Sequence, residues 1–142
     1  MAASTSWAIA SPGDNGEDAT SPKNLPGVRV LNLTWKREHA QINDIAPEGF
    51  SSGDTVQFAF SIAGEKKGSA DYSCTVVQAN FLCDGILRLS DGDIYVSTGP
   101  VDDSGPAAIV GGTGAYFGVR GEFVKTANAE DTAGTYNLRF RR

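Results

Sequence analysis

The sequence has few of the residues on which common catalytic and metal sites depend. It contains one histidine and two cysteines in 142 residues. A lone histidine supports no Ser-His-Asp arrangement, and the two cysteines lack the spacing of a zinc site. No metal site and no cofactor are therefore expected, because no nucleotide motif survives inspection either.

An excess of basic residues is also missing. Twelve Lys and Arg against seventeen Asp and Glu give a net charge of −5. A nucleic-acid partner would need a basic face, so none is expected. No apolar run approaches the roughly 20 residues of a membrane-spanning helix, and membrane insertion is not expected.

The two cysteines, Cys74 and Cys83, are too few for a disulfide framework. We expect free thiols in a reducing, cytoplasmic setting. Their nine-residue separation also suits neighbouring hairpin strands, which leaves a cross-strand bridge open. The first residues carry neither the basic nor the apolar region of a secretory signal.

Glycine is plentiful between residues 108 and 123, where the sequence reads AIVGGTGAYFGVRGEF. A dinucleotide fingerprint starting at Gly112 would need its third glycine at position 117, which is Phe117. No Lys-Ser/Thr pair follows, so a P-loop fails too. These glycines therefore predict a tight turn and bends between strands.

Short runs of β-branched and aromatic residues follow one another from Val28 onward, separated by turn signals. The expected strands are 28–43, 54–63, 68–78, 81–89, 92–98, 107–111, 115–126 and 133–141. Such a series predicts an all-β fold, either a closed antiparallel barrel or a sandwich. Residues 1–26, rich in Ser, Pro, Gly and Asp, predict a flexible arm before a single domain at 27–142.

Side chains alternate along these strands. One face of 54–63 carries Val56, Phe58, Phe60 and Ile62, which is typical of a half-buried strand. One face of the first strand starts apolar and turns polar: Leu31, Leu33, Trp35, Arg37, His39, Gln41 and Asn43. If this face points inward, a barrel would have an apolar floor and a polar mouth, the usual form of a small-molecule site.

Several segments together resemble one family. IVGGTGAYFGVRGEF resembles the signature of dirigent proteins and the matching segment of allene oxide cyclases. Further similar pieces occur in the same order, namely AQINDI, SSGDTVQFAFSIAGEKKG, SADYSCTVV, SDGDIYVSTGP and TYNLRF. The resemblance covers roughly residues 36–141. It implies an eight-stranded antiparallel closed barrel of the calycin and allene oxide cyclase type, with an apolar, ligand-sized lumen, assembled as a dimer or trimer.

The site residues of the cyclases carry over only in part. Gln41 stands where the cyclases have a lumen glutamate, while its partner Asn43 and the cysteine at Cys74 are kept. Phe60 replaces an asparagine that helps hold a water, and Arg120 follows the dirigent pattern. This mixture argues against a jasmonate-type substrate and favours cyclisation or coupling chemistry in general.

Candidate catalytic residues would donate hydrogen bonds to charge that develops on a carbonyl or an opening epoxide. They are Gln41, Asn43, Arg120 and His39. The expected substrate-binding residues are Trp35, Val56, Phe58, Phe60, Tyr72, Cys74 and Val76. Plainer roles remain open: a surface or satisfied His39, Arg120 paired with Glu122 or Asp131, and Gln41 and Asn43 capping a strand end. Tyr72 could be plain lining, and Cys74 a small buried apolar residue.

The favoured function is a cofactor-free cyclase, of isomerase or lyase type, in natural-product biosynthesis. It would fold a lipophilic polyketide-like or fatty-acid-derived substrate into one reactive conformer. Two alternatives stay open: a dirigent-like binder that orients radicals made by another enzyme, and a lipocalin-like carrier without chemistry. Plant dirigent proteins are secreted, so the absence of a signal favours the cyclase.

Overall fold

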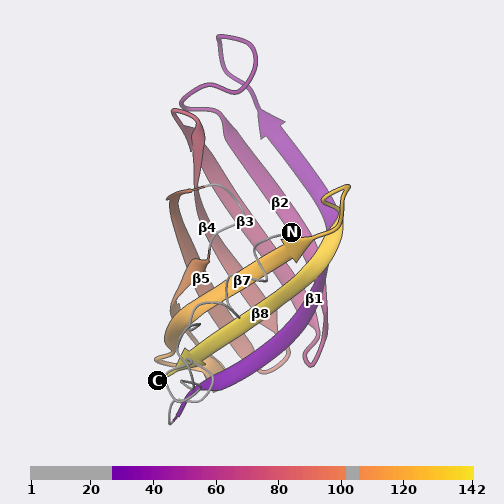
Figure 1. Cartoon of the computed structure of the whole chain (residues 1–142), viewed down its shortest axis with the longest axis vertical. Helices are drawn as coiled ribbons and strands as arrows, with labels where there is room; N and C mark the ends of the chain where they lie inside the picture. The colour runs from indigo at the N-terminus through magenta and orange to yellow at the C-terminus, as the bar shows by residue number, and fades with distance from the viewer. Residues whose placement is uncertain (1–26, 102–105) are drawn as a thin grey trace, which may run out of the picture.

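The computed structural model describes residues 27–101 and 106–142, and the expected arm at 1–26 lies outside them. Eight strands form a closed antiparallel barrel in sequence order, with the last strand pairing with the first (Figure 1). They are β1 (Arg29–Asn43), β2 (Thr55–Gly64), β3 (Gly68–Val77), β4 (Asn80–Leu89), β5 (Gly92–Val101), β6 (Ala107–Gly112), β7 (Arg120–Ala127) and β8 (Ala133–Arg141). The predicted all-β closed barrel is confirmed.

The barrel wall is taller on one side than on the other. Pairing of β1 with β8 stops at Lys36 and Ala133, whereas pairing of β1 with β2 continues to Asn43 and Thr55. Figure 1 shows β1 to β4 rising beyond the ends of β7 and β8. The end of the barrel that carries the β1–β2 loop therefore has a one-sided rim, and this end is called the mouth below.

The opposite end is closed by side chains. Tyr116 and Phe140 meet edge to face with ring centroids 5.9 Å apart. The Arg29 guanidinium lies over both rings, 5.6 Å and 5.0 Å from their centroids. Leucines and isoleucines of the neighbouring strands fill the space above this seal. The core therefore occupies the closed half of the barrel and leaves the mouth half for a cavity.

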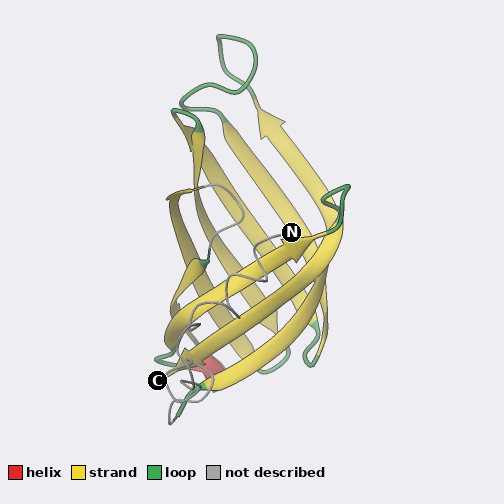
Figure 2. Cartoon of the chain, viewed as in Figure 1, coloured by secondary structure: helices red, strands yellow, loops and turns green. Residues whose placement is uncertain are grey.

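The glycine-rich stretch differs from the expected strand 115–126. A single 3-10 turn, η3 (Gly114–Tyr116), comes first, and β7 begins only at Arg120 (Figure 2). Gly114 has a φ of +61°, and a Cβ there would lie 2.7 Å from the carbonyl oxygen of Asp91. Glycine allows both the left-handed backbone and this close approach, so the chain turns and packs η3 against the β4–β5 turn.

In the part of the chain that the structure describes, no helix is long and apolar enough to cross a membrane.

Candidate functional site in the barrel lumen

A bulge in β1 changes which of its residues face the lumen. Arg37 pairs with Phe60, but the next pair is His39 with Ala59, so Glu38 is an extra residue. One extra residue reverses the inside–outside alternation of everything that follows it. After the bulge, Ala40 and Ile42 line the lumen instead of their neighbours.

The expected inward placement of His39, Gln41 and Asn43 is therefore wrong. His39 lies in a shallow groove on the outer wall, together with residues of β2 to β5. Gln41 is exposed, and the Asn43 amide donates a hydrogen bond to Thr55 Oγ1 at 3.0 Å. This contact joins β1 to β2 at the last pair of their register.

Arg120 also lies outside the lumen lining. Its side chain is exposed, and Nη1 donates to the carbonyl oxygen of Val110 at 3.1 Å. The four predicted catalytic residues are thus not brought together in the cavity.

The predicted substrate-binding residues do meet around one cavity of about 340 Å³. Trp35, Val56, Phe58, Phe60, Tyr72 and Cys74 line it, while Val76 is buried on the same face of β3 without forming part of the lining. The remaining lining residues are Arg37, Ala40, Ile42, Phe50, Phe81, Cys83, Thr98, Ala107, Phe123, Lys125 and Asp131. The volume lies at the lower end of the range for small-molecule sites.

Aromatic rings form one continuous wall of this cavity. The Phe60 ring centroid lies 4.7 Å from that of Trp35, 5.9 Å from that of Phe58 and 5.6 Å from that of Tyr72. The Tyr72 ring rests on Gly85 across the strand pair, where a Cβ would lie 2.3 Å from it. Trp35 Nε1 donates to the Thr126 carbonyl at 2.9 Å. These contacts hold the rings in fixed orientations.

Two cationic side chains reach the cavity that sequence reasoning did not select. Lys125 Nζ lies 4.7 Å from the Trp35 ring centroid and 5.4 Å from that of Phe60. Arg37 Nη1 lies 3.9 Å from Asp131 Oδ2. The signal for Lys125 was present, because it follows Phe123 at the spacing of one strand face.

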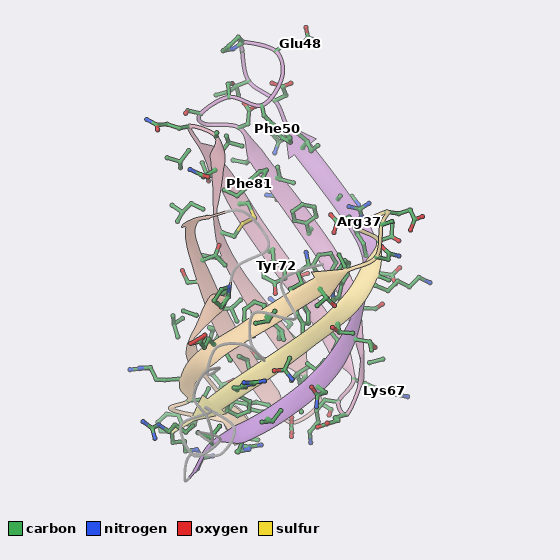
Figure 3. All side chains as sticks on the ribbon, in the orientation of Figure 1. Arg37, Glu48, Phe50, Lys67, Tyr72 and Phe81 are labelled. Carbon is green, nitrogen blue, oxygen red and sulfur yellow. A yellow bond between two sulfur atoms is a disulfide. The ribbon has the colours of Figure 1, made fainter. Side chains whose placement is uncertain are left out.

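A loop and two aromatic rings border the mouth. The β1–β2 loop is held by the buried Asp54 carboxylate, which accepts the backbone N–H groups of Ile45 and Ser51, both at 2.9 Å. Phe50 of this loop meets Phe81 of β4 edge to face at 5.7 Å. In Figure 3 both rings lie between the loop tip at Glu48 and the deeper Tyr72.

Cys74 and Cys83 form a disulfide, which corrects the expectation of free thiols. The β3–β4 register places them directly opposite each other, with Cα atoms 4.0 Å apart. Both line the cavity. Since disulfides persist mainly in oxidising compartments, the expectation of a reducing, cytoplasmic setting loses one of its grounds.

The tyrosine hydroxyls inside the barrel are buried without ordinary hydrogen-bond partners. Among the described residues, Tyr72 and Tyr136 have no hydrogen-bond partner of good geometry for their buried hydroxyls. Burial raises the pKa of both phenols, and the nearby Tyr136 hydroxyl partly offsets this for Tyr72. At the closed end, burial and the Asp91 carboxylate raise the pKa of Tyr116. All three phenols therefore remain protonated donors at neutral pH.

These shifts predict late ionisation of three of the four tyrosines. A phenol whose folded pKa exceeds its unfolded value of about 10 stabilises the fold fully below that pH, and the stability falls as the pH rises further. In an alkaline titration followed at 295 nm, Tyr72, Tyr116 and Tyr136 should ionise together with the loss of far-ultraviolet circular dichroism. Ionisation of all tyrosines near pH 10 in a folded barrel would contradict this expectation.

Within residues 27–101 and 106–142, no group of three or more His, Cys, Asp or Glu side chains is placed to hold a metal ion. The charged groups around the cavity are Lys125, Arg37 and Asp131, and the ring of Tyr72 lines it while its hydroxyl is buried. The two cations could orient a carbonyl or an anion inside an otherwise apolar space.

No protein-family model matches the sequence, and the search of curated proteins finds no match. Solved structures do match. A pyocyanin demethylase aligns with a TM-score of 0.67 and 24% identity, over 79% of this chain and 99% of that chain. A pterocarpan synthase dirigent protein aligns with a TM-score of 0.59 and 17% identity, over 81% of this chain and 85% of that one. A Diels–Alderase from Streptomyces koyangensis aligns with a TM-score of 0.62 and 15% identity, over 97% of this chain and 74% of that one.

At these identities the likeness concerns the fold. It agrees with the strand order and closure of the barrel described above. The chain therefore shares its barrel fold with a dirigent protein and a Diels–Alderase, in agreement with the fold that its sequence resemblance implied.

Proposed function

We propose that the protein is a cyclase that uses no cofactor and closes a ring in a lipophilic polyketide- or fatty-acid-derived substrate, within a natural-product pathway. The observation that carries the proposal is the 340 Å³ cavity, walled by packed aromatic rings and sealed at one end. Such a cavity holds a flexible chain in few conformers, so that its reacting ends stay close. Assembly as a dimer or trimer remains part of this proposal.

The chemistry would depend on shape and on a small number of donors. The Tyr72 phenol lies in the aromatic wall, and Lys125 lies over Trp35 and Phe60. Lys125 can donate a hydrogen bond to a substrate carbonyl on which negative charge develops during ring closure. The Tyr72 hydroxyl, buried without a partner, would do so when its ring shifts toward the ligand. A donor in an apolar cavity stabilises such charge more strongly than one in water.

Binding without chemistry is the second candidate, in the manner of a dirigent protein or a carrier. One observation favours it: His39, Gln41, Asn43 and Arg120 all lie outside the lumen lining. A carrier needs only the apolar cavity and its mouth. The two candidates differ in whether a bound precursor leaves the protein changed.

A linear model substrate with a conjugated diene tethered to an enone would separate them. With wild-type protein, chiral chromatography should show faster ring closure than in buffer and an excess of one enantiomer. A carrier would return the precursor unchanged or give the product distribution of buffer alone. Equal rate and equal stereochemistry with and without protein would contradict the cyclase proposal.

Tyr72→Phe should lower kcat by up to about 100-fold, since it removes one donor to developing charge, with KM little changed. Tyr95→Phe is the matched control, because Tyr95 is exposed on the outer wall of β5. A loss of kcat that is equal in the two variants would argue against a role for the lumen phenol.

A further inference from the structure

We propose that Lys125 and Arg37 form an anion subsite on the β1 and β7 side of the lumen, and that the substrate is an apolar molecule with one anionic oxygen group. This inference rests on the proposed function only in that the substrate occupies the lumen. It names the chemical class of that substrate and the residues that select it.

The charged residues around the cavity favour an anionic ligand. Its charged lining residues are Arg37, Lys125 and Asp131, so cations outnumber anions there. The whole chain has a net charge of −5, and the lumen is thus opposite in sign to the protein that surrounds it. An anionic ligand would be repelled by the exterior on average and attracted once it reached this wall.

Both cationic side chains are placed so that they could contact a ligand. The Arg37 and Asp131 side chains are 29% and 51% exposed and 3.9 Å apart, which describes a loose pair. Exposed pairs of this kind contribute little, so the Arg37 guanidinium can turn toward a ligand without a large loss. Lys125 contacts the faces of Trp35 and Phe60 inside the cavity. An oxyanion beside its ammonium would interact there in a medium of low polarity.

The strand register gives the direction of binding. Trp35 pairs with Ile62, and Arg37 pairs with Phe60. One step closer to the mouth, the next pair of lumen-facing residues is Ala40 with Phe58, and Phe58 also pairs with Tyr72. Lys125 lies at the level of Trp35 and Phe60. The anionic group would therefore bind between Lys125 and Arg37, where the wall formed by β1 and β8 is short. The apolar part would extend past Phe58 and Tyr72 along the taller wall.

Two fluorescent probes with the same rings test this directly. 1-Anilinonaphthalene-8-sulfonate carries an anion, and N-phenyl-1-naphthylamine is its uncharged counterpart. Wild-type protein should bind the anionic probe about tenfold more tightly, the advantage of one charge-assisted contact. Lys125→Met should remove most of that advantage and change the affinity for the neutral probe less than about threefold.

Lys36→Met is the matched control. It makes the same change in net charge one residue from Trp35, but its side chain is exposed on the outer wall. It should leave both affinities unchanged. Lys125→Arg keeps the positive charge and should retain the preference for the anionic probe. This second variant tests the subsite even if Lys125→Met fails to fold. Circular dichroism checks the fold of each variant.

The outcomes separate the two proposals. If the neutral probe binds and the anionic probe binds no better, or if Lys36→Met weakens the anionic probe as much as Lys125→Met does, the anion subsite is wrong while the lumen stands. If neither probe binds the wild-type protein, the lumen itself is not a ligand site, and the proposed function fails with the subsite.

Discussion

Replacing Trp35 by alanine is expected to lower the free energy of unfolding by about 3–5 kcal/mol, the usual cost of emptying a buried tryptophan site. The side chain is 2% exposed and packs against Phe60 and Tyr136. Its loss also leaves the Thr126 carbonyl without the indole N–H and removes a ring beneath the Lys125 ammonium. Urea unfolding followed by circular dichroism measures the change without relying on tryptophan fluorescence.

Trp35→Phe is the control for that experiment. It keeps a ring beside Phe60 but loses the hydrogen bond to Thr126. We expect it to destabilise the barrel less than the alanine variant. A change below about 1 kcal/mol for Trp35→Ala would show that this side chain does not contribute to the core, since such values are typical of exposed positions.

The closed barrel could be predicted because period-two alternation is strong in most of its strands. In β2 the inward residues Val56, Phe58 and Phe60 appear as expected, and they line the cavity. The failure lies in β1, where a single inserted residue reverses the faces. The sequence does carry a trace of it: inward apolar residues fall on odd positions up to Trp35 and on even positions at Ala40 and Ile42.

The nine-residue separation left the disulfide open as an alternative, and the register decides in its favour. Val77 pairs with Asn80 across a two-residue turn, and Gln78 in that turn has a φ of 57°. Counting back along both strands from this turn brings Cys74 opposite Cys83. Cysteine number alone predicts nothing about such pairing, because register is set by turn geometry.

The charged part of the lumen was missed for a different reason. Lys125 follows Phe123 on one face of β7, but this alternation does not show which face of the strand lines the lumen. A lone lysine in a strand usually faces solvent, and only closure of the barrel brings Lys125 over Trp35 and Phe60. Contacts between strands far apart in sequence are not encoded in any local pattern.

Replacing Phe58 by tryptophan tests most directly whether the lumen is the ligand site. Phe58 is partly buried and lines the cavity, so a larger indole would occupy space that the ligand needs. Because the cavity can accept the extra atoms, the free energy of unfolding should change by less than about 1.5 kcal/mol.

The measurement is the dissociation constant of N-phenyl-1-naphthylamine for Phe58→Trp and for Gln57→Trp, which places the same indole on the outer wall one residue away. The lumen account predicts that binding weakens at least about tenfold, or 1.4 kcal/mol, in Phe58→Trp and is unchanged in Gln57→Trp. Wild-type affinity in Phe58→Trp, or an equal loss in Gln57→Trp, would contradict it.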